Sequence, residues 1–297
     1  MTLLQTLITK PSRKVLRRYA LANLIAQILI VVTGGVVRLT GSGLGCPTWP
    51  KCTDESLTTV PEQGIHGFIE FANRTLTGVL VIIALLALIA AWRQPRQARK
   101  GLVLPAALVI VGIFVQAVVG GVSVWFKLNP WIVASHFLIS GLLITVATVL
   151  FWRTLDREHE SVPPSVYALA PWIAVVGSIT VVVGVLVTGA GPHSGDADTP
   201  RNGLDLEILQ HVHSYPGYAL LALALSQFGL LRRLGPSVAK LKRLTVWLLL
   251  AITAQAIIGV IQARTGVPPT LVALHMLGAS VLISLITANF LAIRGKH

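Results

Sequence analysis

Two histidines, His136 and His275, occupy the same position in two copies of a repeated sequence pattern. One copy ends at His136 and the other at His275, and seven residues in them are identical in type and spacing. The identical pairs are Gln116 and Gln255, Ala117 and Ala256, Gly120 and Gly259, Pro130 and Pro269, Val133 and Val272, Ala134 and Ala273, and the two histidines. Because histidine is a common metal ligand, the repeat predicts two related halves that each present one candidate ligand.

A further histidine is expected close to His275. His213 lies near the outer end of an apolar segment at about 210–231, and His275 lies a short way into another at about 270–293. Two histidines at matching depth on neighbouring helices can ligate one metal, and in a helical bundle this metal is usually haem iron. For either histidine taken singly, a hydrogen-bonded core residue is the alternative. His211 is two residues from His213 and points to a different helix face, so it cannot share this role.

The N-terminal half has a different residue where the C-terminal half has His213. Alignment of the halves with a one-residue gap places Asn73 opposite His213, whereas His136 is the counterpart of His275. His66 lies one helical turn before Glu70, on the same face, and is a candidate for the missing ligand. The alternative is that this half holds a porphyrin through one histidine or none, as a site for a substrate that must leave would.

Glu70 is an ionisable residue at the start of the second apolar segment, and Arg74 follows it at the i+4 spacing. One interpretation is a local ion pair at the membrane interface. The other is a carboxylate that faces the N-terminal pocket, where it handles protons or stabilises positive charge on an oxidised substrate.

The composition is that of a membrane protein. Hydrophobic residues make up 54% of the 297 residues and charged residues 12%, which lies outside the range of ordinary soluble proteins. Eight apolar runs approach the ~20 residues needed to cross hydrocarbon, and helix is the state that satisfies a single spanning backbone in lipid. They lie at about 19–39, 70–92, 103–124, 131–152, 167–189, 210–231, 244–263 and 270–293.

The repeat and these runs together predict the fold class. We expect an all-α integral membrane protein with eight transmembrane helices in two tandem four-helix bundles, residues 1–160 and 161–297. Because each repeat has an even number of helices, both halves insert in the same orientation and are related by a pseudo-twofold axis along the membrane normal. A short echo between Val31–Gly35 and Leu186–Gly189, at the ends of the first and fifth segments, fits this plan.

The net charge of +13 is a topology signal. Most basic residues flank alternate loops, so by the positive-inside rule both termini of this multi-pass cell-membrane protein are cytoplasmic and the histidines lie towards the outer face. This distribution leaves no basic patch for a nucleic acid. The basic residues on the cytoplasmic side are Lys10, Arg13, Lys14, Arg17, Arg18, Arg93, Arg96, Arg99, Lys100, Arg153, Arg157, Arg232, Arg233, Lys240, Lys242, Arg243, Arg294 and Lys296.

The only two cysteines, Cys46 and Cys52, fall together in the first outer loop. In an oxidising compartment such a pair favours a disulfide that closes a small loop, with two free thiols as the alternative. The segment between them offers no further soft ligand, which argues against a metal site.

These residues resemble the haem A synthase family over nearly the whole chain. The resemblance is carried by the duplicated eight-helix plan, the cysteine pair after Gly43-Leu44-Gly45, the opening Glu70-x-x-x-Arg74 of the second helix, and the histidines on helices four, six and eight. Asn73 departs from the pattern, because many members have histidine there.

The resemblance implies an oxidoreductase that converts the methyl group of haem O to the formyl group of haem A, with oxygen from water, for cytochrome oxidase. It implies a haem b cofactor on His213 and His275 and a substrate pocket in the N-terminal half, with Glu70 as the essential carboxylate and Cys46 and Cys52 as the outer-loop disulfide. The candidate residues of the substrate pocket are His136, His66, Asn73 and Arg74. The implied partners are haem O synthase, the cytochrome oxidase assembly machinery, membrane lipid and an electron acceptor that the sequence does not identify.

Two other functions fit parts of the pattern. A quinone-linked di-haem b electron carrier would share the histidines, but it would need two ligand pairs, usually at different depths. A transporter with parallel repeats would have paired helices broken by glycine or proline at mid-membrane depth, and the sequence has none.

Overall fold

The computed structural model describes residues 12–155 and 160–294, and within these ranges the chain forms helices and no strands. Lys10, Arg157 and Lys296, on which the topology prediction draws, lie outside the described residues. The long helices are α2 (Arg13–Leu39), α3 (Gly64–Trp92), α5 (Val103–Trp125), α6 (Pro130–Arg153), α7 (Pro164–Ala190), α8 (Leu206–Arg232), α9 (Ala239–Arg264) and α10 (Pro269–Arg294). The short elements are η1 (Pro61–Gln63), α4 (Arg96–Arg99) and η2 (Pro236–Val238).

Seven of the long helices are long and apolar enough to cross a membrane, which confirms the multi-pass prediction at this level. The predicted span at 210–231 forms α8, which is long enough but is not among these seven. The first half of α8 carries polar side chains, including His211, His213 and Ser214, and these lower its mean hydropathy. The eighth span therefore stays a prediction.

Several helices begin a few residues before the apolar runs because local capping groups extend them into polar sequence. The side chain of Asp205 accepts a hydrogen bond from the amide of Ile208 at 2.8 Å, and Asn129 accepts one from Trp131 at 3.0 Å. Proline occupies the first position of α6, α7 and α10, where its missing N–H group costs no helical hydrogen bond. These start signals place the histidines about two turns inside α6, α8 and α10.

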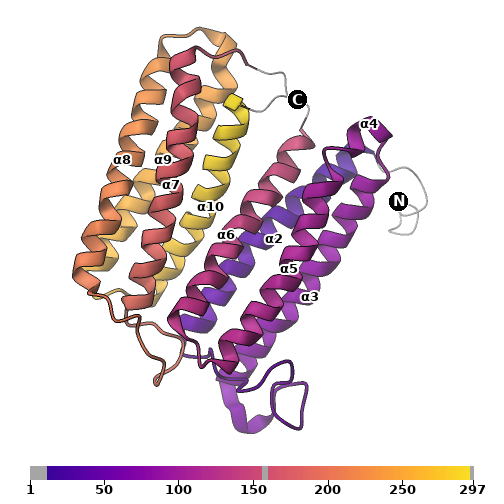
Figure 1. Cartoon of the computed structure of the whole chain (residues 1–297), viewed down its shortest axis with the longest axis vertical. Helices are drawn as coiled ribbons and strands as arrows, with labels where there is room; N and C mark the ends of the chain where they lie inside the picture. Colours follow the sequence, from indigo (N-terminus) through magenta and orange to yellow (C-terminus); the bar gives the residue numbers. More distant parts are fainter. Residues whose placement is uncertain (1–11, 156–159, 295–297) are drawn as a thin grey trace.

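By their mutual contacts, the eight long helices of the described residues form two groups of four, which can be followed in Figure 1. In the first group α2 contacts α3, α3 contacts α5, α5 contacts α6, and α6 contacts α2; in the second, the same cycle joins α7, α8, α9 and α10. The groups meet through contacts of α10 with α2 and α6, and of α6 with α7. The loops 40–60 and 191–205 lie at one end of the molecule, here called the loop end, and the start of α2 and the end of α10 lie at the other (Figure 1).

The burial pattern corrects the register of the echo between α2 and α7. Each buried residue of α7 lies a constant number of positions after a buried residue of α2, and this alignment matches Gly34 with Gly184. The similarity of residue types noted in the sequence instead matches Gly34 with Gly189. The matched buried pairs are Leu16 and Val166, Ala20 and Ala170, Asn23 and Ile173, Gln27 and Gly177, and Gly35 and Val185. The echo is therefore coincidental, because helix packing fixes which face is buried whatever the residue types.

A fully buried polar cluster distinguishes the second group from the first. Nε2 of Gln227 donates to Oγ1 of Thr245 at 2.7 Å and to Oδ1 of Asn289 at 2.8 Å, and Nδ2 of Asn289 donates back to Gln227 at 3.2 Å. The spacing of the sequence repeat places three apolar core residues at the corresponding positions of the first group, namely Ala87, Ala106 and Leu150. Hydrogen bonds thus join α8, α9 and α10 where the first group relies on apolar contact alone.

We expect the Asn289→Leu variant to lower the free energy of unfolding by about 1–2 kcal/mol, because the buried amide of Gln227 loses its partner. The triple variant Gln227→Ala, Thr245→Ala and Asn289→Leu, which copies the first group, should recover part of this loss. Thermal unfolding in detergent measures both, with Ser226→Ala on the exposed face of α8 as the control. Unchanged stability in Asn289→Leu would show that the cluster does not stabilise the helix group.

Candidate functional site

The repeated glutamine holds the backbone of each repeated histidine. Nε2 of Gln116 on α5 donates to the carbonyl oxygen of His136 on α6 at 2.9 Å, and Nε2 of Gln255 on α9 donates to that of His275 on α10 at 3.2 Å. A helix carbonyl already accepts one bond within its own helix, so the amide uses its second lone pair and ties the two helices together at the histidine. The structure therefore explains why glutamine belongs to the repeated pattern.

The repeated glycine makes room for the imidazole ring. A β-carbon placed on Gly120 would lie 3.4 Å from Cε1 of His136, and one on Gly259 would lie 3.4 Å from Cε1 of His275. Each ring therefore lies against the bare backbone of the neighbouring helix. Nδ1 of both histidines is buried and has no hydrogen-bond partner within the described residues. The two sites have the same construction, and a buried imidazole nitrogen without a partner is unusual in a protein interior.

His213 and His275 come together as the sequence predicted. Their ring centroids are 6.3 Å apart and the ring planes are inclined by 75°. Two imidazoles that each bind one iron through a nitrogen at about 2 Å have centroids about 6 Å apart, so the pair has the spacing of a shared haem iron. A β-carbon on Gly184 of α7 would lie 2.8 Å from Cε1 of His213, so a glycine also makes room for this ring.

The corresponding place in the first group is built from Gly34 and Asn73. A β-carbon on Gly34 of α2 would lie 3.9 Å from Nδ2 of Asn73, which repeats the relation of Gly184 to His213. Oδ1 of Asn73 is buried without a partner. The predicted alignment of Asn73 with His213 is thus consistent with the contacts of both side chains.

The other two histidines considered as ligands, His66 and His211, each form a hydrogen bond through Nδ1. His66 lies in the first turn of α3, and its Nδ1 is 2.9 Å from Oγ of Ser42, which leaves Nε2 free for a ligand. His211 is exposed, and its Nδ1 is 2.8 Å from the carbonyl oxygen of Glu207. The exclusion of His211 agrees with this contact, and the role of His66 stays a prediction.

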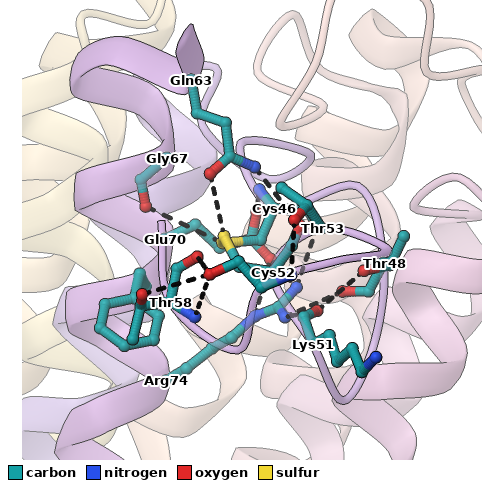
Figure 2. Close-up of a disulfide and its surroundings, with 12 residues drawn as sticks. Cys46, Thr48, Lys51, Cys52, Thr53, Thr58, Gln63, Gly67, Glu70 and Arg74 are labelled. Atoms are coloured by element: carbon teal, nitrogen blue, oxygen red, sulfur yellow. Dashed lines mark hydrogen bonds and ion pairs between the residues drawn. A yellow bond between two sulfur atoms is a disulfide. The ribbon is translucent and has the colours of Figure 1, made fainter. Parts of the chain in front are cut away.

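Glu70 and Arg74 form the ion pair that their spacing allows. Oε1 of the buried Glu70 accepts hydrogen bonds from Nε of Arg74, at 3.1 Å, and from Nη2, while Oε2 accepts the backbone N–H of Cys46 at 2.6 Å. The remaining N–H groups of Arg74 donate to the carbonyl oxygens of Cys46, Thr48 and Lys51 at 3.0, 2.9 and 3.1 Å (Figure 2). All five guanidinium donors are therefore used, and the pair fixes the backbone of the cysteine loop.

Cys46 and Cys52 form the predicted disulfide, with their Cα atoms 4.4 Å apart. Both cysteines are fully buried, and Nε2 of Gln63 donates to the carbonyl oxygen of Cys52 at 3.3 Å. Trp49, between the two cysteines, contacts the ring of Trp125 edge-on and lies over Gly121, where a β-carbon would be 2.3 Å from the indole. The loop is thus held on both α3 and α5.

Several of these contacts could not be found from the sequence. Gly121, which admits Trp49, and Gln63, which holds Cys52, had no motif to mark them. Gln116 and Gln255 were visible as repeated letters, but their role depends on a contact between two helices. Within the described residues no three side chains of histidine, cysteine, aspartate or glutamate gather as a metal site.

Comparison with known proteins agrees with the family resemblance of the sequence. The model of the COX15-CtaA family, described as cytochrome oxidase assembly protein, matches residues 17–287. A heme A synthase of Alkalihalophilus pseudofirmus is 33% identical over 153 residues, which cover 50% of this chain and 50% of the relative. A heme A synthase of Shewanella oneidensis is 30% identical over 190 residues, covering 59% of this chain and 56% of the relative. The chain spans about half the length of these curated relatives.

The contacts of Arg74 predict the effect of replacing it by lysine. Arg74→Lys keeps the charge but has a single nitrogen, which cannot reach Glu70 and three carbonyl groups together. We expect the amides of residues 46–52 to exchange with deuterium at least about tenfold faster, because more than one charge-assisted hydrogen bond is lost. Arg264→Lys at the exposed end of α9 is the matched control. Unaltered exchange in Arg74→Lys would show that the guanidinium does not hold the loop.

Proposed function

The chain belongs to the COX15-CtaA family of cytochrome oxidase assembly proteins, and from this membership we propose that it is a haem A synthase. Its substrate would be haem O, whose methyl group becomes the formyl group of haem A with oxygen from water. The structural observation that supports this proposal beyond family membership is the His213–His275 pair, which has the spacing of two ligands of one haem iron.

The residues around this pair fit a haem b cofactor. Gly184 and Gly259 bring the helix backbones close to the two imidazoles, and Nδ1 of His275 is buried without a partner. When bound, haem b would supply one-electron redox chemistry next to the substrate site. His213 and His275 would hold the iron from two helices, while Gln255 fixes the backbone of His275 so that its ring keeps its orientation.

We propose that the first group of helices is the substrate half. It offers the imidazole of His136, built like that of His275, but has Asn73 where the second group has His213. An amide is a weak ligand for iron, so a haem in this half would be held less firmly and could leave after the reaction. His66 is a further proposed substrate-binding residue of this half. Arg74 was predicted for the same role, but because all its donors are engaged it would act by holding the cysteine loop beside the substrate.

Glu70 is the proposed catalytic carboxylate. Oxidation of a methyl group to a formyl group with oxygen from water releases protons as well as electrons. The electrons pass to the electron acceptor, and a carboxylate close to the substrate can accept the protons. Oε1 of Glu70 accepts two hydrogen bonds from Arg74 and Oε2 accepts one from Cys46, which leaves one lone pair of Oε2 for a proton. Protonation would remove the charge that pairs with Arg74, and this couples it to the contacts that hold the disulfide loop.

We also propose the arrangement in the membrane. The two cycles of helix contacts support two four-helix bundles, at about residues 1–160 and 161–297, related by a pseudo-twofold axis along the membrane normal. In this arrangement α8 is the eighth transmembrane helix, both termini are cytoplasmic, and the loop end faces outwards. The partners would be haem O synthase as the source of substrate, the cytochrome oxidase assembly machinery as the recipient of haem A, and an electron acceptor.

Conversion of haem O by the purified protein tests the function. The full chain in detergent is supplied with haem O and an artificial electron acceptor, and the extracted haems are separated by chromatography. We expect haem A to form while haem b stays with the protein. Two molecules of haem b per chain without any haem A would instead favour the di-haem b electron carrier.

Substitutions in the two halves should have separable effects. His275→Ala should lower the amount of bound haem b at least about tenfold, because one of its two ligands is lost. Glu70→Gln should retain haem b but lower turnover by about 10²–10⁴, the usual contribution of a positioned proton acceptor. Absorption spectra and haem extraction measure the first effect and haem A formation the second, with His211→Ala as the control for both. Full activity in Glu70→Gln would remove Glu70 from the mechanism.

A further inference from the structure

Arg38 joins the two groups of helices at the loop end. It lies in the last turn of α2, yet its Nη2 donates to the carbonyl oxygen of Thr188 on α7 at 2.6 Å. Nε of the same guanidinium is buried and has no hydrogen-bond partner. A buried cationic N–H group without an acceptor is costly, so this atom points to a ligand that would accept its hydrogen bond.

A second arginine belongs to the loop that contacts Arg38. A β-carbon on Gly195 in the loop between α7 and α8 would lie 3.6 Å from Cγ of Arg38, and Nη2 of Arg201 donates to the carbonyl oxygen of Pro192 in the same loop at 2.5 Å. Within the described residues neither arginine is paired with a carboxylate, whereas Arg74 is fully satisfied by Glu70 and three carbonyl groups. Two guanidinium groups without a carboxylate partner, one on the loop and one in contact with it, offer a site for an anion. An anion would offset their positive charge and accept from the donors that Thr188 and Pro192 do not use.

The backbone around Arg201 is held in place. The amide of the next residue, Asn202, donates to the carbonyl oxygen of Gly189 at 3.1 Å, and its side chain donates to that of Leu186 at 2.8 Å. Further along the same loop, Nε2 of His193 is 2.8 Å from the carbonyl oxygen of Val267. The loop is thus attached to the end of α7 and to the turn between α9 and α10, and Arg201 lies in a segment that these hydrogen bonds hold.

Arg38 and its partner Thr188 lie nearer the loop end than the side chains of Asn73 and His213. Arg38 follows Gly34 by one helical turn, and Thr188 follows Gly184, which lies against His213, by one turn as well. A haem carries both its carboxylates on one edge of the ring. If His213 and His275 held a haem, its carboxylates would be favoured at the loop end, where Arg38 and Arg201 could bind them, because charge in the apolar interior is costly.

We propose that Arg38 and Arg201 form a carboxylate-binding site for a tetrapyrrole, and that they hold its propionate edge at the loop end. This inference rests on the proposed haem-binding function. It adds two binding residues to the proposed iron ligands, one from each side of the junction between the helix groups. Arg38 belongs to the first group, and Arg201 belongs to the second. The carboxylates could belong to the haem in either half, since the arginines lie at the junction of both.

Haem b and its dimethyl ester distinguish the site from the iron ligands. The full chain, purified without haem, is titrated with each compound and binding is followed by the Soret band. We expect wild-type protein to bind haem b at least about tenfold more tightly than the ester, because the ester lacks both charges. This preference should shrink severalfold in Arg38→Gln and in Arg201→Gln and stay unchanged in Arg264→Gln.

The same titration separates failure of this inference from failure of the proposed function. Equal affinity of the wild type for haem b and the ester would overturn the carboxylate site while leaving haem binding intact. No Soret change with either compound would overturn the haem-binding function itself. The same titration of His275→Ala and His136→Ala shows which half holds the carboxylates. If His275→Ala abolishes the preference for haem b over the ester, the arginines bind the haem of the second helix group. If His136→Ala abolishes it, they bind the haem of the first group. The comparison in wild-type protein stands even if an arginine variant fails to fold.

Discussion

A bundle of apolar helices tolerates a buried polar group only when that group has a partner, and this constraint organises the whole molecule. Glu70 is accepted inside the bundle because Arg74 and the amide of Cys46 satisfy both its oxygens. The amides of Gln227 and Asn289 satisfy each other. Burying such a pair in an apolar interior costs little free energy. Burying a single unpaired amide or charge costs several kcal/mol, which is on the order of a large part of the free energy of unfolding of a domain.

The exceptions to this rule are informative. Nδ1 of His136 and His275, Oδ1 of Asn73 and Nε of Arg38 are buried without partners, and all four lie in the half of the bundle nearest the loop end. Within the described residues Asn23 and Nε2 of Gln27 are also without partners but lie in the first half and the middle of α2, away from the loop end. The unpaired groups near the repeated histidines are consistent with the proposed ligand binding, because a bound ligand could supply partners to buried polar atoms.

The sequence predicted the parts of this arrangement that depend on local pattern. Apolar runs located the helices, the repeat located His136 and His275, and the two cysteines indicated their disulfide. It could not predict that Arg74 uses every donor, or that Arg38 reaches α7, because these contacts join segments distant in the chain. The echo at Gly34 failed for a related reason: repeated letters in an apolar helix arise easily, and only the packing shows which face is buried.

The contact between the two helix groups lies next to both His275 and the glycine that faces Asn73. Met276 of α10 lies against Gly35 of α2, where a β-carbon would be 2.7 Å from its methyl group. His275 precedes Met276, and Gly34, which faces Asn73, precedes Gly35, so both side chains lie one residue from the shared contact. A shift of α10 at His275 would therefore move the contact next to Gly34 and Asn73. In the proposed arrangement a haem between His213 and His275 would be held from two helices. The half with Asn73 would hold its ligand less firmly, which suits a site whose ligand enters, reacts and leaves.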